Sequence, residues 1–217
     1  MAVCQADFLS IDFSADWNIV ITNMEPALDT ITIRPLSKKD QSIVQEMMLD
    51  TYRNNPAYAS HSELQSGFQV GQPLTDGNIA YIREHCECHT KKRTYSGLVA
   101  VDETQRILGV VLMQKHSPKG TSPWGELSDI ILAPKQRSDG LGQMLLSRAI
   151  AVFRKWGVDQ VFLETGVDNK KAHRFFIGQG WKVVSHTMRI TTALPQLPTT
   201  DPIPTTDLSP DTPKQNI

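Results

Sequence analysis

The stretch 132–143, with the sequence LAPKQRSDGLGQ, has residue types and spacing that could bind an anion. An apolar strand pattern runs into a turn with two glycines, and an amphipathic helix follows. Backbone N–H groups in the first turn of a helix lack intrahelical partners and lie at the positive end of the helix dipole, so they can hold a pyrophosphate. Gly140 and Gly142 would let such a group approach the backbone closely. The stretch contains neither G-x-G-x-x-G nor Gly-Lys-Ser/Thr, which argues against a dinucleotide or ATP site.

Carboxylates on two predicted strands could take up a proton. Glu126 and Asp129 lie in the predicted strand 126–132, and Glu164 lies in the predicted strand 161–165. An ammonium group must lose a proton before its nitrogen can attack a carbonyl carbon, and a nearby carboxylate can accept that proton. Side chains alternate between the two faces of a strand, so we expect Asp129 to point away from the face that holds Glu126. Each of these carboxylates could equally be a solvated or ion-paired group of the sheet.

A second group of chemically capable residues is the sequence HCECH at 85–89. His85, Cys88 and His89 could share one face of a helix as zinc ligands. However, Cys86 and His89 continue the apolar stripe of the preceding helical turns, and no second ligand pair stands at the spacing of a zinc finger. We therefore expect no metal site.

Hydrophobic periodicity predicts the elements that position these residues. Their order indicates an α/β fold. Residues 54–78 are rich in Asn, Gly, Pro, Gln and Ser, and we expect a long irregular stretch there that could carry a substrate loop. The predicted strands are 30–35, 95–101, 107–115, 126–132, 161–165 and 181–190, and the predicted helices are 40–53, a segment around 79–86, 141–156 and 170–179.

Two motifs within this framework resemble those of the GNAT superfamily of acyl-CoA-dependent N-acyltransferases. The signature R/Q-x-x-G-x-G/A of that family appears as RSDGLG at 137–142, directly after LAPKQ, whose LAP is similar to the family's V-x-P. The later segment N-x-x-A-x-x-F-Y-x-x-x-G-F is matched at 169–181, and TITIRP at 30–35 is similar to the first strand of the family. The resemblance covers about residues 31–190. It implies a single α/β domain with a GNAT-type mixed, mostly antiparallel central sheet flanked by helices.

The resemblance also implies where the cofactor and the reacting groups lie. The pantetheine arm of acetyl-CoA would lie between the strands 126–132 and 161–165, and the backbone N–H of Leu132 would polarise the thioester carbonyl. Glu126 and Glu164 occupy positions at which different family members hold a catalytic glutamate. The residues expected to contact the cofactor are Leu132, Ala133, Arg137, Ser138, Asp139, Gly140, Leu141, Gly142, Gln143, Asn169 and Phe176.

Phe176 departs from the family pattern. It replaces the usual tyrosine, which gives a proton to the departing thiolate, and a phenyl ring cannot act as an acid. A thiol pKa near ~8.5 makes the thiolate a tolerable leaving group, and water or His173 could supply the proton. The substitution keeps open an alternative function, a catalytically silent acyl-CoA-binding regulator.

Composition narrows the function classes. The 217 residues include 22 Lys and Arg against 23 Asp and Glu, so the net charge of −1 argues against nucleic-acid binding and against an aminoacyl-tRNA acceptor. The longest apolar run, 107–113, is far shorter than the ~20 residues of a membrane span. Three cysteines form no disulfide framework, and we expect a cytoplasmic protein without membrane contact.

The chain is expected to comprise an N-terminal extension at 1–30, a GNAT domain at 31–193 and a tail at 194–217. The tail holds six of the thirteen prolines and no aromatic residue, so we expect it to be disordered. The predicted activity is direct transfer of an acetyl group from acetyl-CoA to an amine in a ternary complex, by a monomer or a homodimer. A small-molecule amine is marginally favoured over a protein N-terminus or lysine as the acceptor.

Overall fold

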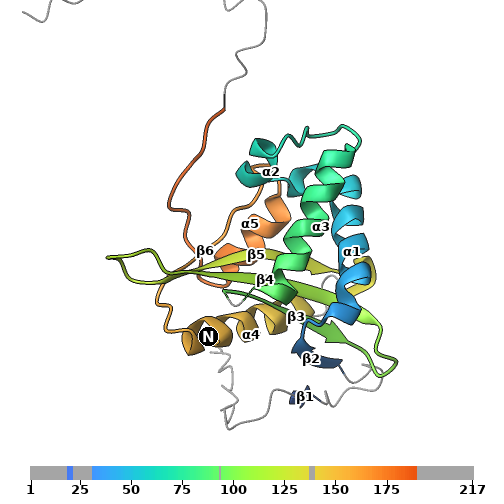
Figure 1. Cartoon of the computed structure of the whole chain (residues 1–217), viewed down its shortest axis with the longest axis vertical. Coiled ribbons are helices and arrows are strands. Elements are labelled where there is room, and N and C mark those ends of the chain that lie inside the picture. The colour runs from blue at the N-terminus through green and yellow to red at the C-terminus, as the bar shows by residue number, and fades with distance from the viewer. Residues whose placement is uncertain (1–18, 22–30, 93, 137–139, 190–217) are drawn as a thin grey trace, which may run out of the picture. The chain divides into compact units, whose positions relative to one another are not determined.

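The computed structural model describes residues 19–21, 31–92, 94–136 and 140–189 (Figure 1). Most of the predicted extension and all of the predicted tail lie outside the described residues, as do Arg137, Ser138 and Asp139. The chain divides into two compact units, 1–182 and 183–217, and the first holds every described helix and strand. Among the described residues, no helix has both the length and the apolar character needed to cross a membrane.

The first unit is built on one sheet of mixed direction. Its strands lie in the order β1-β2-β3-β4-β5-β6, and all neighbours are antiparallel except β5 and β6, which run parallel. This arrangement confirms the predicted α/β class and the mostly antiparallel sheet. The strands are β1 (Ile19–Ile21), β2 (Ile31–Pro35), β3 (Tyr95–Val101), β4 (Ile107–His116), β5 (Trp124–Leu132) and β6 (Val161–Phe162).

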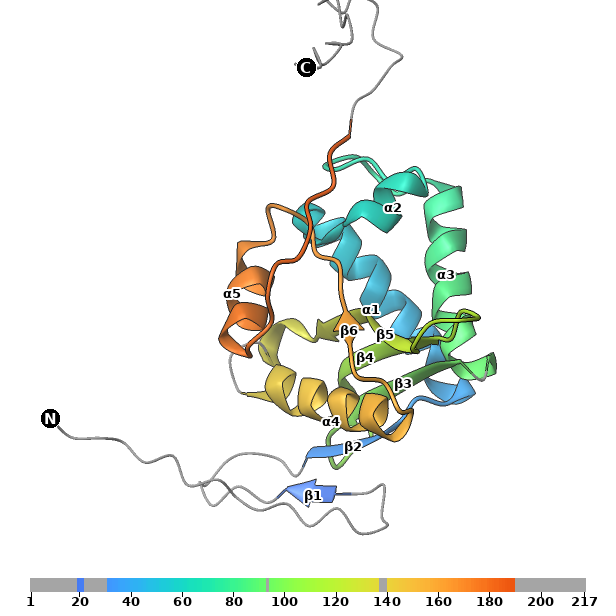
Figure 2. The same ribbon diagram turned by 90° about the vertical axis from the view of Figure 1, so that its left-hand side faces the viewer.

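Helices cover both faces of the sheet, and Figure 2 shows α4 on the side opposite to α1 and α3. Two clusters of buried side chains fill the layers between helices and sheet, one with α4 and the other with α1 and α3. The helices are α1 (Gln41–Asn54), α2 (His61–Gln65), α3 (Asp76–Lys91), α4 (Leu141–Lys155) and α5 (Lys170–Gly178), and the 3-10 turns are η1 (Lys38–Asp40), η2 (Pro56–Tyr58) and η3 (Pro134–Gln136).

The stretch 54–78 is more ordered than its composition predicts. It contains η2 and α2, so the expectation of a continuously irregular segment is wrong. Pro56 stands at the first position of η2, where its missing N–H costs nothing. A reciprocal capping box between Ser60 and Glu63 begins α2: the Glu63 carboxylate accepts hydrogen bonds from the Ser60 N–H at 2.8 Å and from the Ser60 hydroxyl at 2.7 Å.

The C-terminal strand predictions also need correction. The predicted strand 161–165 ends at Phe162, because the residues after it turn toward η2. A Cβ atom on Gly166 would lie 2.1 Å from the Ala57 carbonyl oxygen, which shows how closely the two backbones approach. The predicted strand 181–190 is not formed over the described residues 181–189. Val183 in this segment is 60% exposed, so the half-buried alternation of a strand is not realised.

Candidate active site

The strands β5 and β6 separate after two residue pairs. Glu126 pairs with Phe162 at the end of the parallel ladder, whereas β5 continues to Leu132. The N–H of Ala133 donates to the Leu108 carbonyl at the β4 side of the sheet, at 2.9 Å. Successive N–H groups point to opposite edges of a strand, so the N–H of Leu132 points to the edge of β5 that faces away from β4. No described strand pairs with that edge beyond Phe162.

The hydrogen bond of a second N–H group, that of Ile130, supports the direction given for the Leu132 N–H. The N–H of Ile130, two residues before Leu132, donates to the phenol oxygen of Tyr58 from η2. Ile130 therefore shares the open edge with Leu132, but its amide already has a side-chain partner. Of the two predicted cofactor-binding residues at the strand end, Leu132 directs its amide to the open edge, while Ala133 uses its amide within the sheet. An N–H group that points to an open strand edge can donate to a carbonyl oxygen of a bound molecule.

A β-bulge changes which side chains share a face of β5. Leu112 pairs with Asp129 but Met113 pairs with Leu127, so Ser128 is an additional residue in β5. A bulge inverts the alternation of side chains along the strand. Leu127 consequently packs in the cluster with α4, and Asp129 lies on the α3 face, where its carboxylate contacts His85. The prediction that Asp129 points away from the face of Glu126 is wrong.

Glu126 lies where β5 and β6 part, with its side chain on the face opposite to Leu127. Its Oε2 atom lies 2.8 Å from Nε2 of His116, and the His116 ring stacks on Trp124 with centroids 3.8 Å apart. The carboxylate is 37% exposed. The carboxylate is therefore accessible to solvent at the point where the two strands part.

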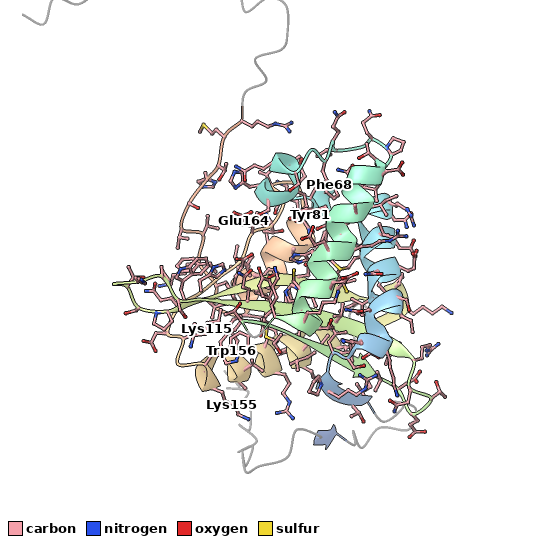
Figure 3. All side chains as sticks on the ribbon, in the orientation of Figure 1. Phe68, Tyr81, Lys115, Lys155, Trp156 and Glu164 are labelled. Carbon is pink, nitrogen blue, oxygen red and sulfur yellow. The ribbon has the colours of Figure 1, made fainter. Side chains whose placement is uncertain are left out.

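Glu164 is held by the first turn of α2. Its carboxylate accepts hydrogen bonds from the Ser62 hydroxyl at 2.8 Å and from the Ser62 N–H at 3.2 Å, and it lies 3.5 Å from Nδ1 of His61. Figure 3 shows Glu164 beside α2, on the side where Tyr81 of α3 also lies. Burial raises the pKa of Glu164, but the hydrogen bonds from Ser62 and the interaction with His61 outweigh it, and the net pKa lies below its usual value. A lowered pKa makes Glu164 a weaker base.

Asp129 is the centre of a network that joins three elements. Its Oδ1 atom accepts a hydrogen bond from the Tyr58 hydroxyl at 3.0 Å, and its Oδ2 atom lies 2.8 Å from Nε2 of His85. Asp129 belongs to β5, Tyr58 to η2 and His85 to α3. The Asp129 side chain is only 4% exposed, so its carboxylate oxygens have these two side chains as partners in place of bulk water. No pattern in the sequence pointed to Tyr58, and His85 was predicted only as a possible metal ligand.

The first turn of α4 has the geometry of an anion site. Gly140 caps the helix with a φ of 78°, which only glycine adopts readily, and it has no side chain that could accept a hydrogen bond from the first turn. The first intrahelical bond runs from the Met144 N–H to the Gly140 carbonyl at 3.1 Å, so the N–H groups of Leu141, Gly142 and Gln143 precede the helical ladder. The Leu141 side chain is buried, and only its backbone can contact a ligand.

The residues of α5 that were predicted to bind the cofactor or to donate a proton have contacts within the protein. The Asn169 side chain caps the helix by accepting a hydrogen bond from the Ala172 N–H at 3.3 Å. Phe176 is buried, and its ring contacts Trp181 edge-on at 5.5 Å. His173 was considered as a substitute proton donor, and its Nε2 atom lies 3.1 Å from the Gly166 carbonyl.

The histidines of the HCECH segment in α3 make hydrogen bonds within the described part of the chain. No group of three or more His, Cys, Asp or Glu side chains is placed there to hold an ion. His85 directs Nε2 to Asp129, and His89 directs Nδ1 to the His85 carbonyl at 2.8 Å. Burial, followed by the charge of His85, lowers the pKa of His89 to about 4, so His89 is neutral at pH 7.

Comparison with known proteins agrees with this geometry. Residues 61–181 match the model of a family described as "Acetyltransferase (GNAT) family". The chain belongs to this family. It is therefore an N-acetyltransferase with an acyl-CoA donor, which confirms the resemblance noted in the sequence and the enzyme class.

Relatives and solved structures extend the comparison. The chain is 29% identical over 177 residues to an aminoalkylphosphonate N-acetyltransferase of Salmonella typhimurium, a match that covers 81% of this chain and 99% of the relative. It is 28% identical over 78 residues to N-alpha-acetyltransferase 30 of Schizosaccharomyces pombe, which covers 36% of this chain and 51% of that protein.

Among solved structures, a tetramutant protein from Bacillus halodurans gives a TM-score of 0.58 at 18% identity, with 73% of this chain and 98% of the other covered. The aminoglycoside N-acetyltransferase AAC(6')-Iy in complex with CoA gives a TM-score of 0.54 at 14% identity, with 79% and 100% covered. At these identities, the two structures support the fold alone.

Proposed function

We propose that the enzyme moves an acetyl group from acetyl-CoA directly to the amine of a small molecule, within a ternary complex. The open edge of β5 is the observation that carries this proposal, because it ends at the Leu132 amide and lies next to the first turn of α4. The Leu132 amide and the first turn of α4 would each bind one part of the same acetyl-CoA molecule. The thioester would lie at Leu132 and the pyrophosphate at the turn after Gly140.

The proposed donor site uses mostly backbone groups. The pantetheine arm would follow the edge of β5 that β6 leaves unpaired, and the N–H groups of residues 141–143 would face the pyrophosphate. Arg137, Ser138 and Asp139 stay proposed contacts, since they directly precede Gly140 in the sequence. Asn169 and Phe176 stay proposed contacts on α5, although Phe176 is 8% exposed and has little surface to offer a ligand.

Glu126 is favoured over Glu164 as the proposed proton acceptor among the two glutamates. Glu126 has one histidine partner, is 37% exposed and lies beside the open edge. Glu164 has several donors from α2, and its lowered pKa suits a structural role in fixing that helix. In either case, the nitrogen attacks the thioester carbon, the C–S bond breaks, and CoA leaves as a thiolate that takes up a proton.

The charges on the α3 face support a cationic acceptor. Burial is the largest cause that raises the pKa of Tyr81, and the carboxylates of Glu63, Asp129 and Glu126 raise it further. The same three carboxylates act on His85. An ammonium group is attracted by such a field, and the relative from Salmonella, matched along 99% of its length, is named for a small amine.

A thiol-release assay on the purified enzyme tests this function and identifies the acceptor. Acetyl-CoA would be offered with separate pools of aminoalkylphosphonates, polyamines, aminoglycosides and peptides with free N-termini. We expect thiol release with one of the small-molecule pools. Release with peptides alone would overturn the proposed acceptor class, and binding of acetyl-CoA without release in any pool would favour a silent acyl-CoA-binding regulator.

We further propose the cytoplasm as the place of action and a monomer or homodimer as the active form. Cys86 and Cys88 are both free thiols, which suits a reducing compartment. The proposed domain bounds stay 1–30, 31–193 and 194–217.

A further inference from the structure

We infer that His85, oriented by Asp129 and Tyr58, takes the proton that an ammonium acceptor loses before its nitrogen attacks the thioester. The inference rests on the proposed acetyl transfer and adds a catalytic residue to it. His85 stands in the HCECH segment, for which the structure provides no metal role among the described residues.

The contacts of His85 define which ring nitrogen can accept a proton. Asp129 is an acceptor when ionised, so the nitrogen that faces it, Nε2, carries a hydrogen. In the neutral ring, Nδ1 is then the atom with the free lone pair. The His85 side chain is 24% exposed while Asp129 is 4% exposed, so the carboxylate is enclosed and the ring partly reaches solvent. A buried carboxylate that holds a partly exposed imidazole ring orients the histidine for base catalysis.

The network is attached to the edge where the thioester would lie. The Tyr58 oxygen receives the Ile130 N–H and donates its own hydrogen to Asp129. Ile130 and Leu132 point their amides to the same open edge of β5. Tyr58 therefore fixes the Asp129 carboxylate from the donor side, and His85 contacts that carboxylate from α3. Asp129 and Tyr58 act as positioning residues, because they reach the proton only through His85.

The charges around His85 favour the protonated ring that the step creates. Burial lowers the pKa of His85, but the hydrogen bond and charge of Asp129, together with the charges of Glu63 and Glu126, outweigh burial and raise the net pKa above its usual value. Tyr81 faces the His85 ring one helical turn away with nearly parallel planes, and Tyr58 is protonated because burial and Asp129 raise its pKa. His89, which contacts the ring edge-on at 4.8 Å, is neutral and does not oppose protonation.

For a protonated amine, the transfer moves two protons away from the attacking nitrogen. One N–H bond of the ammonium breaks, and the proton goes to Nδ1 of His85, which becomes an imidazolium paired with Asp129. The nitrogen lone pair forms the bond to the thioester carbon, and the C–S electron pair leaves with CoA. The second proton of the nitrogen goes to Glu126. One of the two protons ends on the CoA thiol and the other in solvent.

The test compares His85→Gln with His186→Gln, a change at an exposed histidine in 183–189, by thiol release across pH and by calorimetric binding of acetyl-CoA. We expect His85→Gln to lower kcat about 10²- to 10⁴-fold, with the Kd for acetyl-CoA changed less than twofold. In the wild type, we expect kcat/KM to rise with pH, with the midpoint of the rise above pH 6.5. His85→Gln should remove this rise. His186→Gln should leave both unchanged. An unaltered rate and pH profile in His85→Gln would overturn the inference, whereas absence of turnover in the wild type with every amine would overturn the proposed function instead.

A measurement on the wild-type enzyme covers the case in which His85→Gln does not fold. Nitrogen NMR of labelled histidines, with the signals of the other histidines assigned by substitution, reports which nitrogen of His85 carries the hydrogen. We expect the Nε2–H form and a midpoint above 6.5, and Asp129→Asn should move the midpoint to lower pH. A neutral ring with hydrogen on Nδ1, or a midpoint below 6.5, contradicts the inference.

Discussion

The Cδ1 atom of Leu132 lies 3.4 Å from the position that a Cβ atom on Gly142 would occupy. This contact joins the end of β5 to the first turn of α4. The amide that can polarise a thioester and the turn that can hold a pyrophosphate are therefore parts of one packed unit. A Cβ at Gly142 would also lie 3.6 Å from the Phe175 ring, an ordinary contact distance, so packing alone does not require glycine there.

Charge at Gly140 should decide acetyl-CoA binding. Gly140→Asp and Gly140→Asn differ by one charge and have nearly equal size, and both side chains tolerate the left-handed backbone better than other residues. We expect the aspartate variant to bind acetyl-CoA at least tenfold more weakly than the asparagine variant, measured by calorimetry, because its carboxylate would repel the pyrophosphate. Equal affinities would contradict a pyrophosphate at this turn.

The two glutamates should separate into a catalytic and a structural residue. We expect Glu126→Gln to lower kcat and Glu164→Gln to lower thermal stability with a smaller effect on kcat, since Glu164 fixes α2. The pKa of Glu164 is lowered in the folded enzyme, so its contribution to stability is present above the unfolded pKa of 4.5 and is lost as pH falls through the folded value. The melting temperatures of wild type and Glu164→Gln should converge at low pH. A rate loss confined to Glu164→Gln would reverse the assignment.

Gly166→Ala should slow turnover indirectly, through the position of η2. The added Cβ would lie 2.1 Å from the Ala57 oxygen and 2.6 Å from the Ala59 oxygen, so the loop after β6 must move away from η2. Tyr58 belongs to η2, and its contact with Asp129 would loosen. We expect a lower kcat with the Kd for acetyl-CoA nearly unchanged. Gly178→Ala in α5, where nothing lies within 4 Å of the added atom, is the matched control and should keep full activity.

The ion pair between Asp40 and Arg34 should make the free energy of unfolding depend on pH in the acidic range. Its carboxylate accepts hydrogen bonds from the Arg34 guanidinium at 2.8 and 2.9 Å and from the Ser37 N–H at 2.9 Å. The hydrogen bond from Arg34 is the largest cause that lowers the pKa of Asp40 from 3.8 to about 2. Stability from this group is complete above pH 3.8 and is lost as pH falls through about 2. We expect Asp40→Asn to reduce the free energy of unfolding by about 2 kcal/mol at pH 6, with the difference shrinking in urea titrations as the pH falls toward 2.

Local sequence signals predicted most elements of the fold. Alternation and β-branched residues predicted β3 at its observed bounds, Tyr95–Val101, and apolar spacing predicted α1 and α4 to within one residue. The short α2 was missed although its Ser60 and Glu63 capping box was readable. The prediction for 54–78 rested on the abundance of Asn, Gly, Pro, Gln and Ser, and not on this capping box.

The features that the sequence did not predict depend on contacts between distant residues. The bulge at Ser128 arises from the register between β4 and β5, and nothing in the sequence LSDII marks it. Tyr58 and Asp129 are 71 residues apart in the chain, and His85 and Asp129 are 44 apart. Periodicity reports one element at a time, so it could neither join these three side chains nor place Asp129 on the face of Glu126.

The most direct test measures acetyl-CoA binding and amine-dependent thiol release on the same sample of wild-type enzyme. We predict saturable binding that Gly140→Asp weakens, together with thiol release that requires an amine of small molecular size. Failure of wild type to bind acetyl-CoA would contradict the donor site at the open edge of β5, and binding with no amine-dependent release would contradict the transfer.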